Sequence, residues 1–286
     1  MSSAQLAIGG LALALTGGDS VGRAMALPGM TAFALCGENN PDIVIALDSC
    51  LQMSQLCELH RFKILDGNVE CYFGVDADGI YHYRFSSSEE VRFDPRQPLG
   101  AAVTTMDSDG KLRFALWLAY CMIGAGRGRM PVHSSVVVCD GRAVLCLGES
   151  GTGKSTHTRL WLENIPGTYL LNDDSPILAA AKDGPAVVYG SPWSGKTHCY
   201  RQEHYPVAAL LRLEQRPENN IRRLATIEAF AALQPSCPPA MAHDERCLDM
   251  TVRFVSAVIK HTPAYLLGCL PDADAACLSH RTIYGS

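Results

Sequence analysis

One segment near the middle of the chain constrains its fold more than any other feature. Residues 148–156 read Gly-Glu-Ser-Gly-Thr-Gly-Lys-Ser-Thr and satisfy the pattern G-x-x-x-x-G-K-[ST] in full. The segment follows the apolar run 143–147 and precedes an amphipathic stretch, which predicts a strand, a glycine loop and a helix. In such a loop, inward-pointing N–H groups and the positive end of the helix dipole form a cradle for phosphate groups. The alternative is a glycine-rich turn that binds nothing.

The pattern predicts a site for a nucleoside triphosphate and Mg²⁺. We expect the Lys154 ammonium on the β- and γ-phosphates and the Ser155 hydroxyl on the metal. The residues predicted to bind the nucleotide are Gly148, Glu149, Ser150, Gly151, Thr152, Gly153, Lys154, Ser155 and Thr156.

Two adjacent carboxylates follow this helix closely. Asp173 and Asp174 end the stretch Thr-Tyr-Leu-Leu-Asn-Asp-Asp, which predicts a strand directly after the helix. Such a strand delivers both carboxylates to the sheet edge that carries the phosphates, where one can hold the metal and the other can accept a proton. The alternative is an aspartate pair that caps the turn before Ser175 and Pro176.

Two further residues are candidates for the same site. His133 begins an apolar strand that we expect to pair beside the strand of the phosphate loop, although a lone histidine is commonly structural. Lys196 lies in a second glycine-rich segment, Gly-Ser-Pro-Trp-Ser-Gly-Lys-Thr, and could neutralise charge on a substrate or on phosphate. The alternative for this segment is a surface turn with Trp193 as a plug.

Composition excludes several other classes of protein. The net charge of −5, with only 19% charged residues, offers no basic surface for nucleic acid or an anionic membrane. The apolar stretch 6–15 is too short to span a bilayer and lacks the flank of a signal peptide, so we expect a strand pair there and a cytoplasmic protein. None of the 12 cysteines forms a Cys-x-x-Cys pair, which favours reduced thiols over zinc or disulfides.

The chain changes character near residue 110, and we place a domain boundary there. Residues 1–110 read as a β-rich domain of short, locally antiparallel strands; it could recognise a substrate or extend the core of the chain. The predicted strands are 6–15 as a pair, 42–47, 61–65, 70–75, 79–85, 91–93 and 101–106.

Residues 111–286 alternate strands with helices, as expected for an α/β catalytic domain. The first predicted helix begins near residue 112. Four later helices are predicted over about 153–163, 226–233, 248–261 and 272–280. The predicted strands are 131–139, 142–147, 168–171, 175–179, 186–189, 208–213 and 264–267.

Three motifs together resemble the catalytic domain of bacterial HPr kinase/phosphorylase and, more distantly, ATP-dependent phosphoenolpyruvate carboxykinase. They are Val-His-Ser at 132–134, Leu-Gly-Glu-Ser-Gly-Thr-Gly-Lys-Ser-Thr at 147–156 and Leu-Leu-Asn-Asp-Asp at 170–174. The resemblance implies a P-loop kinase core with ATP and Mg²⁺ as cofactors. It also implies His133 as the active-site histidine, Asp173 as the general base, Asp174 as a metal ligand and Lys196 as a substrate-binding residue.

The implied activity is transfer of the γ-phosphoryl group of ATP to a serine-type hydroxyl on a peptide, protein or small molecule. Because the N-terminal block does not resemble the regulatory domain of that family, the resemblance does not identify the acceptor. The alternatives are a nucleotide-binding ATPase without transfer and a carboxykinase-like enzyme. The oligomeric state stays open, with a homo-oligomer among the possibilities.

Overall fold

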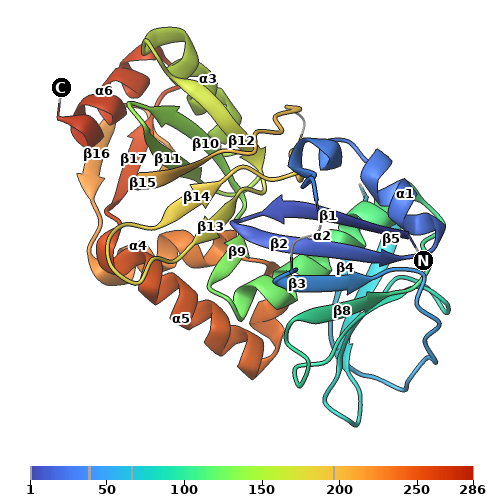
Figure 1. Ribbon diagram of the computed structural model, residues 1–286. Coiled ribbons are helices and arrows are strands. Elements are labelled where there is room, and N and C mark those ends of the chain that lie inside the picture. Colours follow the sequence, from blue (N-terminus) through green and yellow to red (C-terminus); the bar gives the residue numbers. More distant parts are fainter. Residues whose placement is uncertain (1, 38–39, 66, 196, 286) are drawn as a thin grey trace.

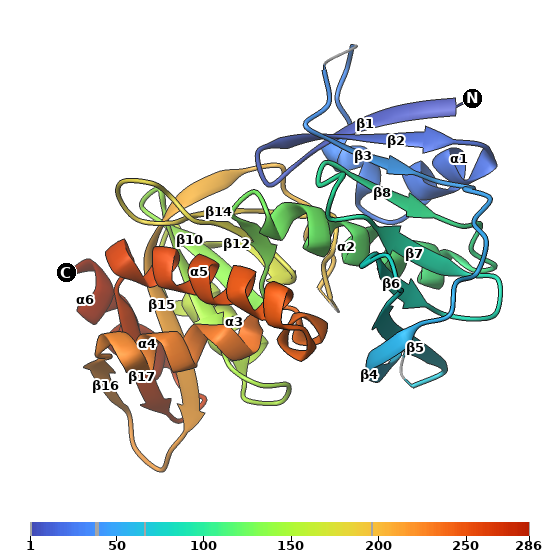
Figure 2. The ribbon, with the colours of Figure 1, turned by 90° about the horizontal axis from the view of Figure 1, so that it is seen from below.

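The computed structural model describes residues 2–37, 40–65, 67–195 and 197–285. In this part of the chain it is a mixed α/β structure with an eight-stranded and a nine-stranded sheet. Figure 1 shows the first sheet in blue and cyan on the right and the second in green to red on the left. Helix α2 (Asp109–Ala125) lies between the two sheets, as both views show (Figures 1 and 2). Among the described residues, no helix is both long enough and apolar enough to cross a bilayer.

The first sheet has the strand order β1-β2-β3-β8-β7-β6-β5-β4. Its strands are β1 (Ser2–Ile8), β2 (Leu11–Gly17), β3 (Ile43–Ala46), β4 (Cys57–Ile64), β5 (Val69–Val75), β6 (Tyr81–Arg84), β7 (Glu90–Phe93) and β8 (Gly100–Val103). The expected strands are present, but the expectation of local antiparallel pairing is wrong for β3, which runs parallel to both β2 and β8. The reason is a crossover connection between β2 and β3 that was not predicted. Helix α1 (Asp19–Ala26) and the 3₁₀ turn η1 (Met30–Phe33) follow β2, and parallel neighbours require such a connection.

The second sheet has the order β12-β10-β11-β15-β14-β13-β9, with β17 and then β16 added beside β15. Its strands are β9 (Arg129–Pro131), β10 (Ser134–Cys139), β11 (Arg142–Leu147), β12 (Tyr169–Asp174), β13 (Ile177–Ala179), β14 (Val187–Tyr189), β15 (His204–Gln215), β16 (Asn220–Arg223) and β17 (Ala264–Cys269). The strand predicted over 131–139 is divided, because the N–H of Val132 donates to Pro176 and that of His133 to Ser236, outside either ladder. Strand β16 was not predicted, since three of its four residues are polar.

Helices cover both faces of the second sheet. They are α3 (Lys154–Asn164), α4 (Thr226–Leu233), α5 (Glu245–His261) and α6 (Ala273–Tyr284), with 3₁₀ turns η2 (Gln234–Ser236) and η3 (Pro239–His243) after α4. Alternate residues of β10 point to opposite faces, so Val137 packs in one cluster with Trp161 of α3, whereas Val136 packs in another with Phe254 of α5. Figure 1 shows α3 and α6 on one side of the sheet and α4 and α5 on the other.

The register of β10 positions the catalytic candidates. Both β11 and β12 run antiparallel to β10, so β11 and β12 point the same way and end at the same edge of the sheet. Ser134 is paired with Leu147 on one side and with Asp174 on the other. The glycine loop after Leu147 and the aspartate pair therefore lie only two strands apart.

The predicted domain boundary near residue 110 falls at the start of α2. One hydrophobic cluster nevertheless continues through both halves, from Leu6 and Phe73 in the first sheet to Leu145 and Val255 in the second half. Helix α2 is buried on most sides because it packs between the two sheets, whereas the sequence predicted a single apolar face. The division into domains 1–110 and 111–286 stays a prediction.

Candidate functional site

The glycine loop joins β11 to α3, as the sequence predicted. Gly153 stands at the N-cap of α3 with φ of 101°, a left-handed conformation that favours glycine. A Cβ on Gly148 would lie 2.3 Å from the Thr152 hydroxyl oxygen, so the tight turn requires glycine there. Because Gly153 has no side chain to cap the helix, the first-turn N–H groups are left for an anion.

Lys154 lies on the inner side of this loop. Its ammonium donates to the carbonyl oxygens of Gly148 at 2.8 Å and Glu149 at 3.1 Å, and lies 2.9 Å from His133 Nε2. Only 8% of the residue is exposed. Burial lowers the pKa of Lys154, while the carboxylates of Asp174 and Asp173 oppose that shift. Lys154 therefore sits as a buried cation beside the two predicted carboxylates.

Asp173 is the buried member of the aspartate pair. Its Oδ1 accepts a hydrogen bond from Ser155 Oγ at 3.1 Å and another from the hydroxyl of Ser135. Ser155 is in the first turn of α3 and Ser135 is in β10, directly opposite Asp173. This carboxylate is thus held against the hydroxyl that the sequence assigns to Mg²⁺.

Asp174 and His133 form a second, more exposed pair. His133 Nδ1 lies 3.2 Å from Asp174 Oδ1, and both side chains are about half exposed. Because the Lys154 ammonium can only donate, His133 Nε2 accepts its hydrogen bond, which leaves the ring proton on Nδ1 facing Asp174. His133 therefore links Lys154 to Asp174.

The second glycine-rich segment also reaches this site. The N–H of Gly195 donates to the carbonyl of Asp173 at 2.6 Å, and Ser194 forms a β-bridge with Asp174. A Cβ on Gly195 would meet the Asp173 oxygen and the Asp174 Cβ at 3.0 Å each, so this close approach favours glycine. The predicted substrate residue Lys196 lies outside the described residues.

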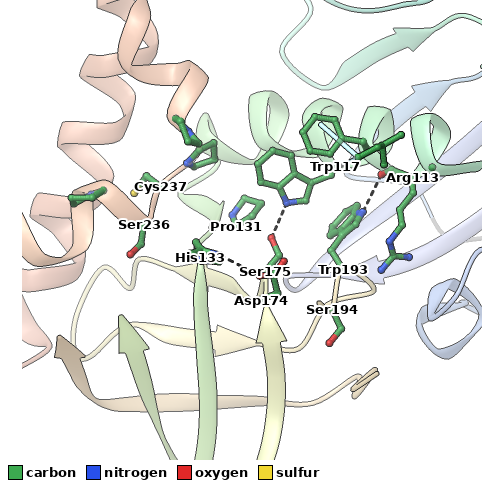
Figure 3. A pocket seen from close by; sticks show the side chains of 16 residues that line it. Arg113, Trp117, Pro131, His133, Asp174, Ser175, Trp193, Ser194, Ser236 and Cys237 are labelled. Carbon is green, nitrogen blue, oxygen red and sulfur yellow. Dashed lines mark hydrogen bonds and ion pairs between the residues drawn. The ribbon is translucent and has the colours of Figure 1, made fainter. Parts of the chain in front are cut away.

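Three cavities follow one another along this edge. A cavity of about 380 Å³ contains the loop, Lys154, Ser155 and the aspartate pair. It shares Gly151, Gly153 and Thr156 with a cavity of about 400 Å³ beside α3. On the other side it shares His133 and Asp174 with a cavity of about 480 Å³ beneath α2 (Figure 3). We call these the phosphate, helix-side and α2 cavities.

Sequence reasoning missed some members of the site. Ser135 lies in the strand predicted beside the phosphate loop, but a single hydroxyl near the start of an apolar run does not mark a site. Two other contacts brace the loop from β15: Arg212 pairs with Glu149 at 3.4 Å, and Gln215 donates to the Gly151 carbonyl at 3.2 Å. No local pattern marks these, because β15 is distant in the sequence.

Oxygen donors make the phosphate cavity the better candidate for a hard cation. The Ser155 hydroxyl and the Asp173 and Asp174 carboxylates are the ligand types that Mg²⁺ prefers. Elsewhere, Cys139, Asp140 and His280 bring three potential ligand atoms within 4.8 Å of one another. Burial raises the pKa of the Cys139 thiol, which opposes the thiolate that a metal would need.

Comparison with known proteins gives little beyond this geometry. No family model and no curated protein matches the sequence. Among solved structures, the Hpr(Ser) kinase/phosphatase from Coxiella burnetii matches over 54% of this chain and 88% of that chain, with a TM-score of 0.34 and 13% identity. A likeness this weak does not assign the chain to that family.

Proposed function

We propose that this protein is an ATP-dependent phosphotransferase that moves the γ-phosphoryl group to a serine-type hydroxyl. The observation that carries the proposal is the convergence of Lys154, Ser155, Asp173 and Asp174 in one cavity at the N-terminus of α3. The loop N–H groups and Lys154 are suited to hold the β- and γ-phosphates, since phosphoryl transfer depends mainly on positioning and charge neutralisation.

The helix-side cavity supports a complete nucleotide rather than phosphate alone. It begins at Gly151 and Thr156 on the loop and is bounded farther out by the apolar side chains of Leu160, Leu213 and Leu270. A base and ribose in this cavity would keep the triphosphate in line with the loop and the γ-phosphate toward Asp174.

Mg²⁺ would be held by Ser155 and Asp173, whose oxygens already lie 3.1 Å apart. When bound, Mg²⁺ neutralises charge on the phosphate oxygens. The resemblance assigned the metal to Asp174 and the base to Asp173. The contacts support the opposite division, because Asp173 is buried against Ser155 whereas Asp174 lines both the phosphate cavity and the α2 cavity.

In the transfer step, the acceptor oxygen forms a bond to the γ-phosphorus while its proton passes to the Asp174 carboxylate. The bond between the γ-phosphorus and the bridging oxygen breaks, and ADP keeps that electron pair. The His133 Nδ1 proton orients Asp174, and the Lys154 ammonium stabilises the charge on the phosphoryl oxygens.

The experiment is to incubate the purified chain with γ-labelled ATP, Mg²⁺ and a panel of hydroxyl acceptors that includes serine peptides, free serine and HPr. We expect label in an acceptor. Lys154→Ala should weaken MgATP binding about 10- to 100-fold, because it removes a charge-assisted contact to phosphate. Titration calorimetry measures this affinity.

Lys182→Ala is the matched control, since Lys182 is exposed and lines none of the three cavities. It should bind MgATP as the unmodified chain does. Equal affinity in the Lys154 variant would contradict the proposal, and label released only as free phosphate would favour the ATPase alternative.

A further inference from the structure

The α2 cavity is the largest of the three cavities at the site, and its walls differ from those of the phosphate cavity. The His133–Asp174 pair lies on one side of it and Trp117 of α2 on the other (Figure 3), and Phe114 of α2 also lines it. Leu65, from the turn between β4 and β5, closes it from the first sheet. The cavity is therefore lined jointly by α2, one turn of the first sheet and the second half of the chain.

Several contacts brace the apolar walls. The rings of Phe114 and Trp117 stack with centroids 5.3 Å apart, and Trp117 Nε1 donates to Ser175 Oγ at 2.8 Å. Trp193 is buried and donates to the carbonyl of Arg113 at 3.3 Å. The opposite wall is a proline-rich turn that contributes Pro235, Pro238 and Pro239. These contacts position the aromatic faces toward the cavity.

The polar end of the cavity adjoins the proposed site of phosphoryl transfer. Asp174 and His133 lie at the border with the phosphate cavity, so a group in the α2 cavity can present an oxygen to the γ-phosphate only beside them. The rest of a bound molecule would lie mainly against tryptophan, phenylalanine and proline, with Arg113, Ser194 and Ser236 as the other polar lining residues away from Ser175. A cavity of about 480 Å³ is within the ordinary range for small-ligand sites.

We propose that the α2 cavity is the acceptor site and that it selects a hydroxyl flanked by an aromatic or large aliphatic group. This inference rests on the proposed phosphotransfer and names its acceptor class. A free serine or a glycine-flanked serine would leave the rings of Trp117 and Phe114 exposed to water. An acceptor whose phenyl group is buried against these rings should bind about 10- to 100-fold more tightly. The flanking group can belong to a peptide or to a small alcohol, since the chemistry of the cavity is the same for both.

The test uses matched probes with the full chain. N-acetyl-Phe-Ser-Gly-amide and N-acetyl-Gly-Ser-Phe-amide are compared with N-acetyl-Gly-Ser-Gly-amide, and 2-phenylethanol with ethanol. We expect kcat/KM for the better phenyl-bearing probe to exceed that of its partner at least about tenfold. A preference confined to the peptide pair would identify a peptide acceptor, and one confined to the alcohols a small molecule.

Variants at Trp117 test whether this cavity is responsible. Trp117→Ala should abolish most of the preference through KM, while Trp117→Phe should retain most of it because it keeps an aromatic face. Ile227→Ala is the control, since Ile227 is 75% exposed on α4 and lines no part of the cavity. It should leave the preference unchanged.

Calorimetric binding of the phenyl probes without nucleotide separates this inference from the proposed function. If the chain does not bind MgATP but does bind the phenyl probes, and Trp117→Ala weakens that binding, the proposed phosphotransfer is wrong and the apolar binding site stands. Equal use of the glycine and phenylalanine probes, or transfer to none of them by a chain that binds MgATP, would overturn the acceptor class alone.

Discussion

At the scale of single residues, the site depends on the direction of the hydrogen bonds among Lys154, His133 and Asp174. Lys154 can only donate, so His133 accepts on Nε2 and turns its Nδ1 proton to Asp174. Asp173, by contrast, accepts from the hydroxyls of Ser135 and Ser155. Adjacent aspartates thus have different partners, which gives the pair two different roles.

These contacts predict different defects for the two aspartates. Asp174→Asn should reduce phosphoryl transfer about 10²- to 10⁴-fold, the usual contribution of a positioned base, with MgATP binding retained. Asp173→Asn should instead raise the Mg²⁺ concentration required for half-maximal activity. Initial rates over a Mg²⁺ titration distinguish the two variants, and the reversed pattern would restore the roles implied by the family resemblance.

At the scale of secondary-structure elements, three neighbouring strands build the site. The predicted strand, loop and helix around residues 148–153 are confirmed as β11, the glycine loop and α3. The prediction that a strand after α3 carries both aspartates to the same edge is confirmed by the register of β12 on β10. Helix α1 was missed because it has only eight residues and contains Gly22, although its apolar residues Val21 and Ala24 are spaced as on one helical face.

The first sheet holds a buried ionic group whose effect on stability can be measured. Glu90 of β7 is fully buried and contacts His82 at 3.2 Å, Arg92 at 2.8 Å and Arg84 at 3.0 Å. Burial alone would raise the pKa of Glu90, but the hydrogen bonds from His82, Arg92 and Arg84 lower it to about 2. A lowered carboxyl pKa stabilises the fold above the unfolded value near 4.5, and this contribution is lost as pH falls toward 2.

We therefore expect the free energy of unfolding to fall by about 3 kcal/mol between pH 4.5 and 2 on account of Glu90. Glu90→Gln should be less stable near pH 7 by up to about 3 kcal/mol, because it leaves the partly buried Arg84 and Arg92 charges without their partner, and should lose less stability on acidification. Urea unfolding at a series of pH values measures both effects. Parallel pH profiles for the two proteins would contradict this account.

At the scale of the whole molecule, the two sheets share one core around α2. The turn between β1 and β2 is pressed against the second half: Tyr120 donates to the Ile8 carbonyl at 3.2 Å and Arg129 to the Gly9 carbonyl at 3.2 Å. A Cβ on Gly9 would lie 2.3 Å from the Tyr120 hydroxyl and 2.6 Å from Ile177. The first sheet and the site-bearing sheet are therefore coupled by direct contacts.

Gly9→Ala should destabilise the chain by overpacking this contact, at about 1–3 kcal/mol beyond the strain of its backbone angle. Gly141→Ala is the matched control, because Gly141 has a similar φ of 68° against 61° for Gly9 and no atom within 4 Å of its Cβ position. Thermal unfolding should show one transition, shifted further down for Gly9→Ala than for Gly141→Ala. Equal shifts would mean that the contact with Tyr120 and Ile177 contributes nothing.

The sequence alone determined the features that depend on local chemistry. The spacing of glycines, Lys154 and Ser155 between an apolar run and an amphipathic helix predicted a strand, loop and helix, because glycine adopts left-handed backbone angles without strain and a helix start presents free N–H groups. The tertiary structure decided which segments that are distant along the chain come together at the site. It brought Trp117 and Leu65 into one cavity with the His133–Asp174 pair and gave Asp173 and Asp174 different surroundings, because such arrangements arise from long-range packing that no local pattern encodes.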